Sequence, residues 1–362
     1  MKTAAKVSIF FVLTLLGWVS QAQDPNYSQF FNNPVYYNPA YTGLNTGISA
    51  RFSYRDLWPS LPYDFKAYHF DADWGDRGFP GSGGIGMFFN TDNEGLGFIR
   101  NLNLGVSLAV RIPFTANSVG QLGIKASWVQ KSINWDDLVF TDEIDARYGI
   151  NNPATFIRPE NNVRNVPDFG FGGIVQFGDD RGGMTATLGA SVDHLFEPDQ
   201  SFLQTAKAPI PRKWVGHADA IFSVGPTSGI NQVETGALKI NPGFIYQVQG
   251  KRNSVQVGLN IAKYGLILGI WYKGDFGSNG NSCLPILAGY GMHLMDNMNL
   301  RIAYNYDLQM SGALQGTGGA HEVSLILQFG NNGLISGGRS SGGRMRGGHY
   351  EGQTPWECAE FW

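Results

Sequence analysis

The sequence carries little charge, few cysteines and no long apolar run beyond its first residues. Only 15% of the 362 residues are Asp, Glu, Lys or Arg, whereas about a quarter is usual for a soluble domain. The 26 basic residues nearly balance the 29 acidic ones, so nothing favours a nucleic-acid partner. After residue 22 no apolar stretch reaches the roughly 20 residues that a spanning helix needs. These absences disfavour an ordinary soluble domain and a helical membrane protein.

Aromatic residues and glycine are what the chain has in excess. Aromatics make up 13% of the sequence, and there are 49 glycines. A barrel that crosses a membrane with strands alternates lipid-facing and lumen-facing side chains, so its mean hydropathy stays modest. The composition therefore predicts a transmembrane β-barrel.

Residues 1–22 are typical of a secretory signal peptide. Lys2 and Lys6 precede a short apolar run, and small residues at Ser20 and Ala22 predict cleavage before Gln23. The alternative is an N-terminal membrane anchor, but the run is shorter than a span requires. No cysteine follows the predicted cleavage position, which disfavours a lipoprotein.

A period of two runs through the segment from Leu102 to Phe114. Apolar side chains occupy the even positions, and Asn103, Ser107 and Arg111 are among the odd ones. About fourteen segments of this kind start near residues 47, 65, 82, 99, 118, 168, 183, 212, 235, 254, 266, 284, 298 and 320. We expect an all-β, antiparallel, up-and-down transmembrane barrel over residues 47–330. A soluble β-sandwich is the competing fold, and Pro242 and Pro285 are the weakest points of the strand prediction.

The connections alternate in length. Short ones fall near residues 77, 116, 180, 264 and 296, and longer ones cover 132–167, 195–211, 274–282 and 309–319. Outer-membrane barrels have short periplasmic turns and longer external loops. With both termini in the periplasm, each of these long loops lies outside the cell.

Two segments lie outside the predicted barrel. Residues 23–46 are rich in Pro, Asn and Tyr, and we expect an ordered segment at or inside the periplasmic mouth. Residues 331–362 form a Gly- and Arg-rich periplasmic tail that ends in Trp356, Phe361 and Trp362. The tail is either disordered or a tether for a periplasmic partner. Cys283 is expected at the external rim and Cys358 in the periplasm, so we predict no disulfide.

No residue pattern predicts catalysis, a cofactor or a metal site. Asp193 and His194 are the only tempting neighbours, but adjacent strand residues point to opposite faces. An acidic stretch at 134–145 lacks the spacing of a calcium loop. We expect charges on the polar strand faces to brace the lumen, with a selective channel as the alternative; they are Arg51, Arg55, Asp71, Asp73, Arg111, Lys125, Asp193, Asp219, Lys239, Arg301, Asp307 and Glu322.

Aromatic residues in two long loops suggest a recognition surface. The candidate partner-binding residues are Trp135, Asp136, Phe140 and Asp142 in one loop, and His194, Phe196, Gln200 and Phe202 in the other. Trp356, Phe361 and Trp362 are the candidates for a periplasmic partner.

A series of short motifs resembles the PorP/SprF family of outer-membrane proteins from Bacteroidota. The series covers nearly the whole chain after residue 22, and its order and spacing are more specific than any one motif. It includes Ser28-Gln29-Phe30, Tyr36-Tyr37-Asn38-Pro39-Ala40, Tyr54-Arg55-Asp56-Leu57-Trp58-Pro59, His194-Leu195, Gly269-Ile270-Trp271-Tyr272-Lys273 and Gly319-Ala320-His321-Glu322.

The resemblance implies a non-enzymatic component of the type IX secretion and gliding machinery. It implies a secreted adhesin with a type B C-terminal domain as cargo, and periplasmic ring lipoproteins as partners beside the outer-membrane lipid. The tail after Gly330 departs from the family pattern. The alternative function is a transport channel for hydrophobic compounds or of the porin type, in which a segment around Asn38-Pro39-Ala40 could plug the lumen.

Overall fold

A computed structural model describes residues 24–330 except 63–64, 77, 80, 82, 96–98, 116, 146, 151–158, 160, 179–182, 204–205, 225–237, 276–281, 296–297 and 311–315. The predicted signal peptide lies outside the described residues. So does the predicted tail, with Cys358, Trp356, Phe361 and Trp362.

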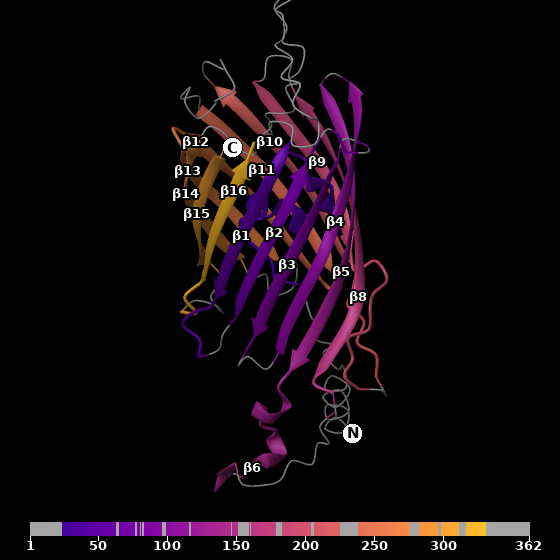
Figure 1. Ribbon diagram of the computed structural model, residues 1–362. Helices are drawn as coiled ribbons and strands as arrows, with labels where there is room; N and C mark the ends of the chain where they lie inside the picture. The colour runs from indigo at the N-terminus through magenta and orange to yellow at the C-terminus, as the bar shows by residue number, and fades with distance from the viewer. Residues whose placement is uncertain are drawn as a thin grey trace, which may run out of the picture.

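Fourteen antiparallel strands close into one barrel in the described part of the chain (Figure 1). They are β1 (Gly47–Leu57), β2 (Lys66–Gly75), β3 (Gly84–Glu94), β4 (Ile99–Thr115), β5 (Ser118–Ile133), β8 (Val163–Gly178), β9 (Met184–Asp193), β10 (Lys213–Val224), β11 (Leu238–Gln249), β12 (Arg252–Lys263), β13 (Leu266–Asp275), β14 (Ser282–Met295), β15 (Met298–Gln309) and β16 (Ala320–Phe329). Each strand pairs with its sequence neighbour, and β1 pairs with β16 to complete the ring. The predicted fold class is confirmed.

The alternation of side chains separates an apolar outer face from a polar lumen. In β4, Leu104, Val106 and Leu108 are exposed on the outside while Ser107 is buried. In β2, Phe70 faces outward, and its neighbours His69 and Asp71 are completely buried. Strand geometry explains this, because successive side chains point to opposite faces of the sheet.

The two ends of the barrel differ in their connections. We call the end where β1 begins the turn end and the opposite one the loop end. The loop end carries the connections 134–162 and 194–212, and the first extends beyond the barrel as a small hairpin of β6 (Ile144–Asp145) and β7 (Gly149–Ile150) (Figure 1). Two connections depart from the expected separation of short and long connections between the two ends. At the loop end, β11 and β12 are joined by only Gly250 and Lys251. At the turn end, 13 residues, 225–237, separate the end of β10 from the start of β11.

Pro242 and Pro285 both lie inside strands, and strand pairing lapses beside each. The β10–β11 pairing stops at Gly243 and resumes at Ile240. The β13–β14 pairing stops at Ile286 and resumes at Cys283. A proline has no N–H to give to the neighbouring strand, so the sheet tolerates it where one ladder is interrupted.

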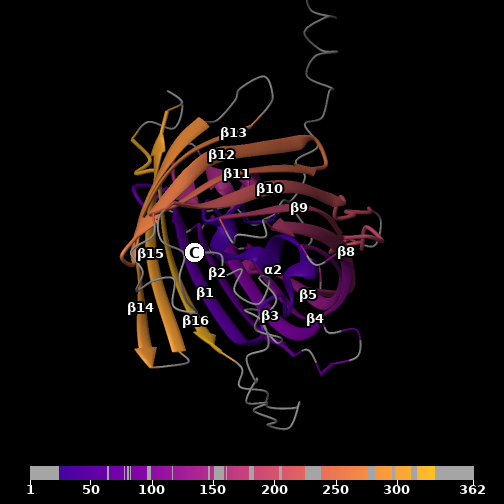
Figure 2. The same ribbon diagram turned by 90° about the horizontal axis from the view of Figure 1, so that it is seen from above.

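Residues 24–46, which we call the plug, occupy the lumen. They form three short helical turns, η1 (Phe30–Asn32), α2 (Pro34–Tyr37) and η2 (Pro39–Tyr41). Figure 2 shows α2 inside the ring of strands. Every residue from 27 to 44 is buried. No helix among the described residues has the length and apolar character needed to cross a membrane.

Candidate functional site

The plug runs along the barrel from one end to the other. At the loop end, the backbone N–H of Asp24 donates to Gln249 Oε1 at 3.1 Å, at the last residue of β11. At the turn end, Gly43 has φ +63°, and a Cβ there would lie 2.4 Å from Gly84 Cα. The structure therefore extends the predicted mouth segment through the whole lumen.

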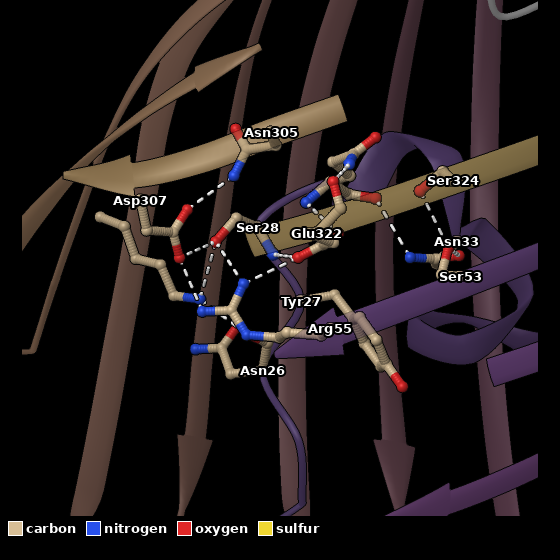
Figure 3. A network of polar contacts seen from close by, with 12 residues as sticks. Asn26, Tyr27, Ser28, Asn33, Ser53, Arg55, Asn305, Asp307, Glu322 and Ser324 are labelled. Carbon is tan, nitrogen blue, oxygen red and sulfur yellow. Dashed lines mark hydrogen bonds and ion pairs between the residues drawn. The ribbon is translucent and has the colours of Figure 1, made fainter. Parts of the chain in front are cut away.

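The first and last strands of the barrel, which pair with each other, both contribute to binding the plug (Figure 3). The carboxylate of Glu322 accepts from the backbone N–H groups of Ser28 at 2.8 Å and Gln29 at 2.9 Å. Arg55, the register partner of Glu322 across the β1–β16 seam, forms ion pairs with Glu322 at 2.8 Å and with Asp307 at 2.6 Å. Asp307 also accepts from Ser28 Oγ at 2.7 Å. One buried cluster thus joins β1, β15, β16 and the plug.

A second charged cluster holds the plug at the turn end. Arg51 pairs with Asp71 and, at 2.6 Å, with Asp73. The other oxygen of Asp73 accepts from the backbone N–H of Gly43 at 2.7 Å. His69 Nε2 lies 2.8 Å from Asp71. The prediction that inward charges brace the lumen is confirmed for these residues, and the plug shares in the bracing.

Strands β5, β8 and β9 of the barrel wall contact the middle of the plug. The amide of Asn38 donates to the carbonyls of Gly173 at 3.1 Å and Ala190 at 3.2 Å. A Cβ at Gly172 would lie 2.1 Å from Asn38 Oδ1, and one at Gly123 would lie 2.4 Å from Ala40 N. Glycine fits these wall positions because plug atoms, side-chain atoms at Gly172 and backbone atoms at Gly123, come so close.

His194 links the second long loop to the start of the plug. Its Nε2 lies 3.0 Å from Asp24 Oδ2 and its Nδ1 lies 2.9 Å from Asp168 Oδ2. Lys213 Nζ lies 3.2 Å from the same Asp24 oxygen. Burial opposes the charge on the ring, but the two carboxylates outweigh it and raise the pKa of His194 to about 10. Burial likewise opposes charge on Asp24, but His194 and Lys213 hold the pKa of its carboxyl well below its usual range.

The structure brings some of the predicted loop residues together. Trp135 and Phe202, from different loops, make an edge-to-face contact with 5.8 Å between ring centroids. Phe196 is 70% exposed and its ring lies 5.7 Å from that of Phe169 on β8. Asp136 and Asp142 are exposed and Phe140 is half-buried. Their role in binding a partner stays a prediction.

His194 and Gln200 do not lie on the loop surface. His194 is only 4% exposed and contacts the plug, and Gln200 is buried with its backbone N–H bonded to Ala208. The expectation that Asp193 and His194 point to opposite faces is wrong, because both are buried on the lumen side. The reason is local: His194 adopts φ +55°, so the strand alternation ends at Asp193.

The sequence did not predict the contacts between the plug and the barrel, although the residues that make them belong to motifs named above. Ser28, Gln29, Asn38 and Arg55 all belong to the motifs that carry the family resemblance, and in the structure they bind one another or the barrel wall. The available signal was that family motifs occur both in the irregular segment before the barrel and in its strands, which suggests contact between the two. Among the described residues, no group of three or more His, Cys, Asp or Glu side chains could hold a metal ion.

A family comparison agrees with this geometry. The model for "Type IX secretion system membrane protein PorP/SprF" matches residues 19–327. The chain belongs to the PorP/SprF family. It is therefore an outer-membrane component of type IX secretion, and the recognition made from the motifs is confirmed. No curated protein matches the sequence.

Solved outer-membrane barrels resemble the chain only in broad outline. A Pseudomonas aeruginosa FadL homologue has 11% identity and a TM-score of 0.45, over 84% of this chain and 94% of that one. The β domain of the Bordetella autotransporter BrkA has 11% identity and a TM-score of 0.41, over 79% and 99%. Omp33 of Acinetobacter baumannii has 8% identity and a TM-score of 0.38, over 80% and 100%.

Proposed function

We infer that this PorP/SprF protein is a closed scaffold that binds a secreted protein at its loop end and anchors it or assists its export. The plug is the observation that supports this best. Residues 27–44 are buried throughout, and their polar groups bond to strands around the ring. A barrel whose lumen is filled in this way is suited to holding a partner rather than to passing solutes.

The loop end faces the cell exterior in this proposal. Its support is the length of connections 134–162 and 194–212, since external loops exceed periplasmic turns in outer-membrane barrels. In that orientation β16 ends at the periplasmic side, but Asp24 lies near the outer mouth. This orientation of the plug differs from the periplasmic N-terminus expected from the sequence.

Exposed apolar side chains beyond the barrel support a protein partner. Tyr148 and Ile150 on the β6–β7 hairpin are each 67% exposed, and Phe196 is 70% exposed. Apolar side chains outside the lipid-facing band have no membrane to cover them, and such surfaces usually bind proteins. The partner proposed from the family resemblance is an adhesin with a type B C-terminal domain. Periplasmic ring lipoproteins are proposed as partners of the opposite side, and no catalysis is assigned.

Surface display of the cognate adhesin tests this function. We expect deletion of the gene to abolish display, and a plasmid copy to restore it. A copy with Phe196→Ser and Ile150→Ser should fold but restore display only in part, while Lys207→Ser on the same end should restore it fully. Normal display and secretion in the deletion strain would refute the proposal.

A transport channel is the second candidate. The observation that favours it is a cavity of about 500 Å³ at the loop end, above the first residues of the plug. Such a channel would require the plug to move. Single-channel recording discriminates, because a steady open pore in the purified protein favours transport over anchoring.

A further inference from the structure

The connection between β5 and β8 begins with an arm, residues 134–150, that projects beyond the barrel (Figure 1). At its start, Trp135 contacts Phe202 of the second long loop. Its tip is the β6–β7 hairpin, in which two residues of each strand pair with the other. Two strands of this length bury too little to be stable by packing alone. The shape of the arm must therefore be fixed by local bonds.

Side chains of the arm bond to its own backbone. In the hairpin turn, the carboxylate of Asp145 accepts from the N–H groups of Arg147 at 2.7 Å and Tyr148 at 2.9 Å. Just before the hairpin, the carboxylate of Glu143 accepts from the N–H of Phe140 at 2.8 Å. These bonds hold the arm in one conformation from within. A segment that is already ordered loses less conformational entropy when a partner binds it.

The ordered arm presents apolar side chains to solvent. Ile144 and Ile150 are register partners across the hairpin, so their side chains lie on the same face. They are 54% and 67% exposed, and Tyr148 between them in sequence is 67% exposed. Val139, before the hairpin, is also exposed. Apolar side chains that lie together in an ordered segment and remain exposed mark a surface that another molecule covers.

The charge of this connection indicates which molecule that is. Residues 134–162 include six acidic and two basic residues. Anionic lipid headgroups attract basic segments, so a net acidic one disfavours a lipid surface. A second copy of the chain on a two-fold axis would set the same acidic surface against itself. A different polypeptide, with basic side chains around an apolar patch, complements both the charge and the exposed apolar residues of the arm.

We propose that the arm docks the secreted partner, and that it binds a surface of that protein on which basic side chains surround an apolar patch. The proposal rests on the proposed function and deepens it, because it names the segment that makes the contact and the chemistry of the surface that it receives. Ile144, Tyr148 and Ile150 supply the apolar contact. The acidic residues attract the partner and orient it.

Site-specific photocrosslinking in living cells tests the contact. The photoreactive residue p-benzoylphenylalanine replaces Tyr148 at the tip of the arm or, as the matched control, Tyr264, which is 66% exposed at the turn end. Both variants are used in cells that display the adhesin normally. We expect an adduct with the adhesin from position 148 and none from position 264. An adduct of position 148 with lipid or with a second copy of this chain, or no adduct there, would overturn the proposal.

Binding of a purified adhesin fragment that carries the C-terminal domain measures the apolar contribution. We expect Ile144→Ser with Ile150→Ser in the full-length protein to weaken binding about tenfold, the loss that a modest interface hot spot gives. Leu61→Ser with Met310→Ser removes two exposed apolar side chains from other connections at the loop end and should leave the affinity unchanged. Equal losses in the two double variants would contradict a specific role of the arm.

The association rate of the same fragment measures the charge contribution. Asp136→Asn with Asp142→Asn should slow association about threefold at low salt, since exposed charge contacts are individually weak, and should reduce its dependence on salt. Glu197→Gln with Asp275→Asn removes two carboxylates elsewhere at the loop end and should change neither property. An association rate of the arm variant that matches the unsubstituted protein at every salt concentration would refute attraction of a basic surface.

Failure of this proposal differs from failure of the proposed function. Normal display in the deletion strain would refute the function itself. Loss of display in that strain, together with no adhesin adduct from position 148, would leave the function in place and remove the arm as the docking segment.

Discussion

Carboxylates in the lumen satisfy two needs at once. Glu322 balances the charge of Arg55 and also accepts from two backbone N–H groups of the plug. Asp73 does the same for Arg51 and the N–H of Gly43. A buried carboxylate with both a cation and hydrogen-bond donors is well compensated, whereas removal of one member leaves the other charge buried without a partner.

The Glu322→Gln variant tests this balance. The amide keeps the shape but leaves Arg55 with one carboxylate, so we expect a loss of about 3–5 kcal/mol in the free energy of unfolding. The temperature at which the folded band disappears in a heat-modifiable gel measures the change. Glu197→Gln, whose partner Arg212 is also exposed, should leave that temperature unchanged; an equal fall in both variants would contradict the role of the cluster.

The contact of His194 with Asp24 should depend on pH. The folded pKa of about 10 lies above the ordinary value of 6.5, so the charged ring stabilises the fold fully below pH 6.5 and loses this effect as the pH rises through 10. We therefore expect the difference in melting temperature between the protein and its His194→Gln variant to shrink from pH 6.5 to pH 10. A constant difference would show that the ring acts without its charge.

At the scale of elements, the strands and an ordered segment before them were predictable, but the path of the plug and its contacts were not. The period of two in β4 and β2 comes from strand geometry, so composition and spacing suffice to find it. The plug has no period, and it bonds to residues as far as 294 positions away, as between Ser28 and Glu322. Such pairs leave no local pattern, and the left-handed turn at His194 likewise depends on the contacts around it.

We expect a wall glycine that lies close to the plug to tolerate substitution by alanine less well than a wall glycine with free space beside it. Alanine at Gly123 would place its Cβ 2.4 Å from Ala40 N, and we expect it to destabilise the barrel by about 1–3 kcal/mol through overpacking. Gly216 on β10 has nothing within 4 Å of its Cβ position, so Gly216→Ala is the matched control. Thermal midpoints of the two variants measure the effect, and a tolerated Gly123→Ala would mean that the plug is loosely seated.

At the scale of the whole molecule, the proposed closed scaffold predicts that the plug prevents conduction. A barrel of fourteen strands is wider than the eight-stranded barrels that side chains can fill, so it needs a segment inside to be closed. We expect the purified protein to show no steady conductance in a planar bilayer. Deletion of residues 24–44 should give open-channel steps in those molecules that still migrate as folded barrels. Open steps in the intact protein would refute a closed scaffold.

The seam where the barrel closes also dictates an order of events in time. Ser28 and Gln29 leave the ribosome long before Glu322, yet they bond to it, and the β1–β16 pairing encloses them both. A plug that reaches from Gln249 to Gly84 cannot be threaded easily through a finished ring. Ser28 and Gln29 can therefore form these bonds only after β16 has been synthesised, and the pairing of β1 with β16 encloses them. The pairing of β1 with β16 therefore closes the barrel around a plug that is already in place.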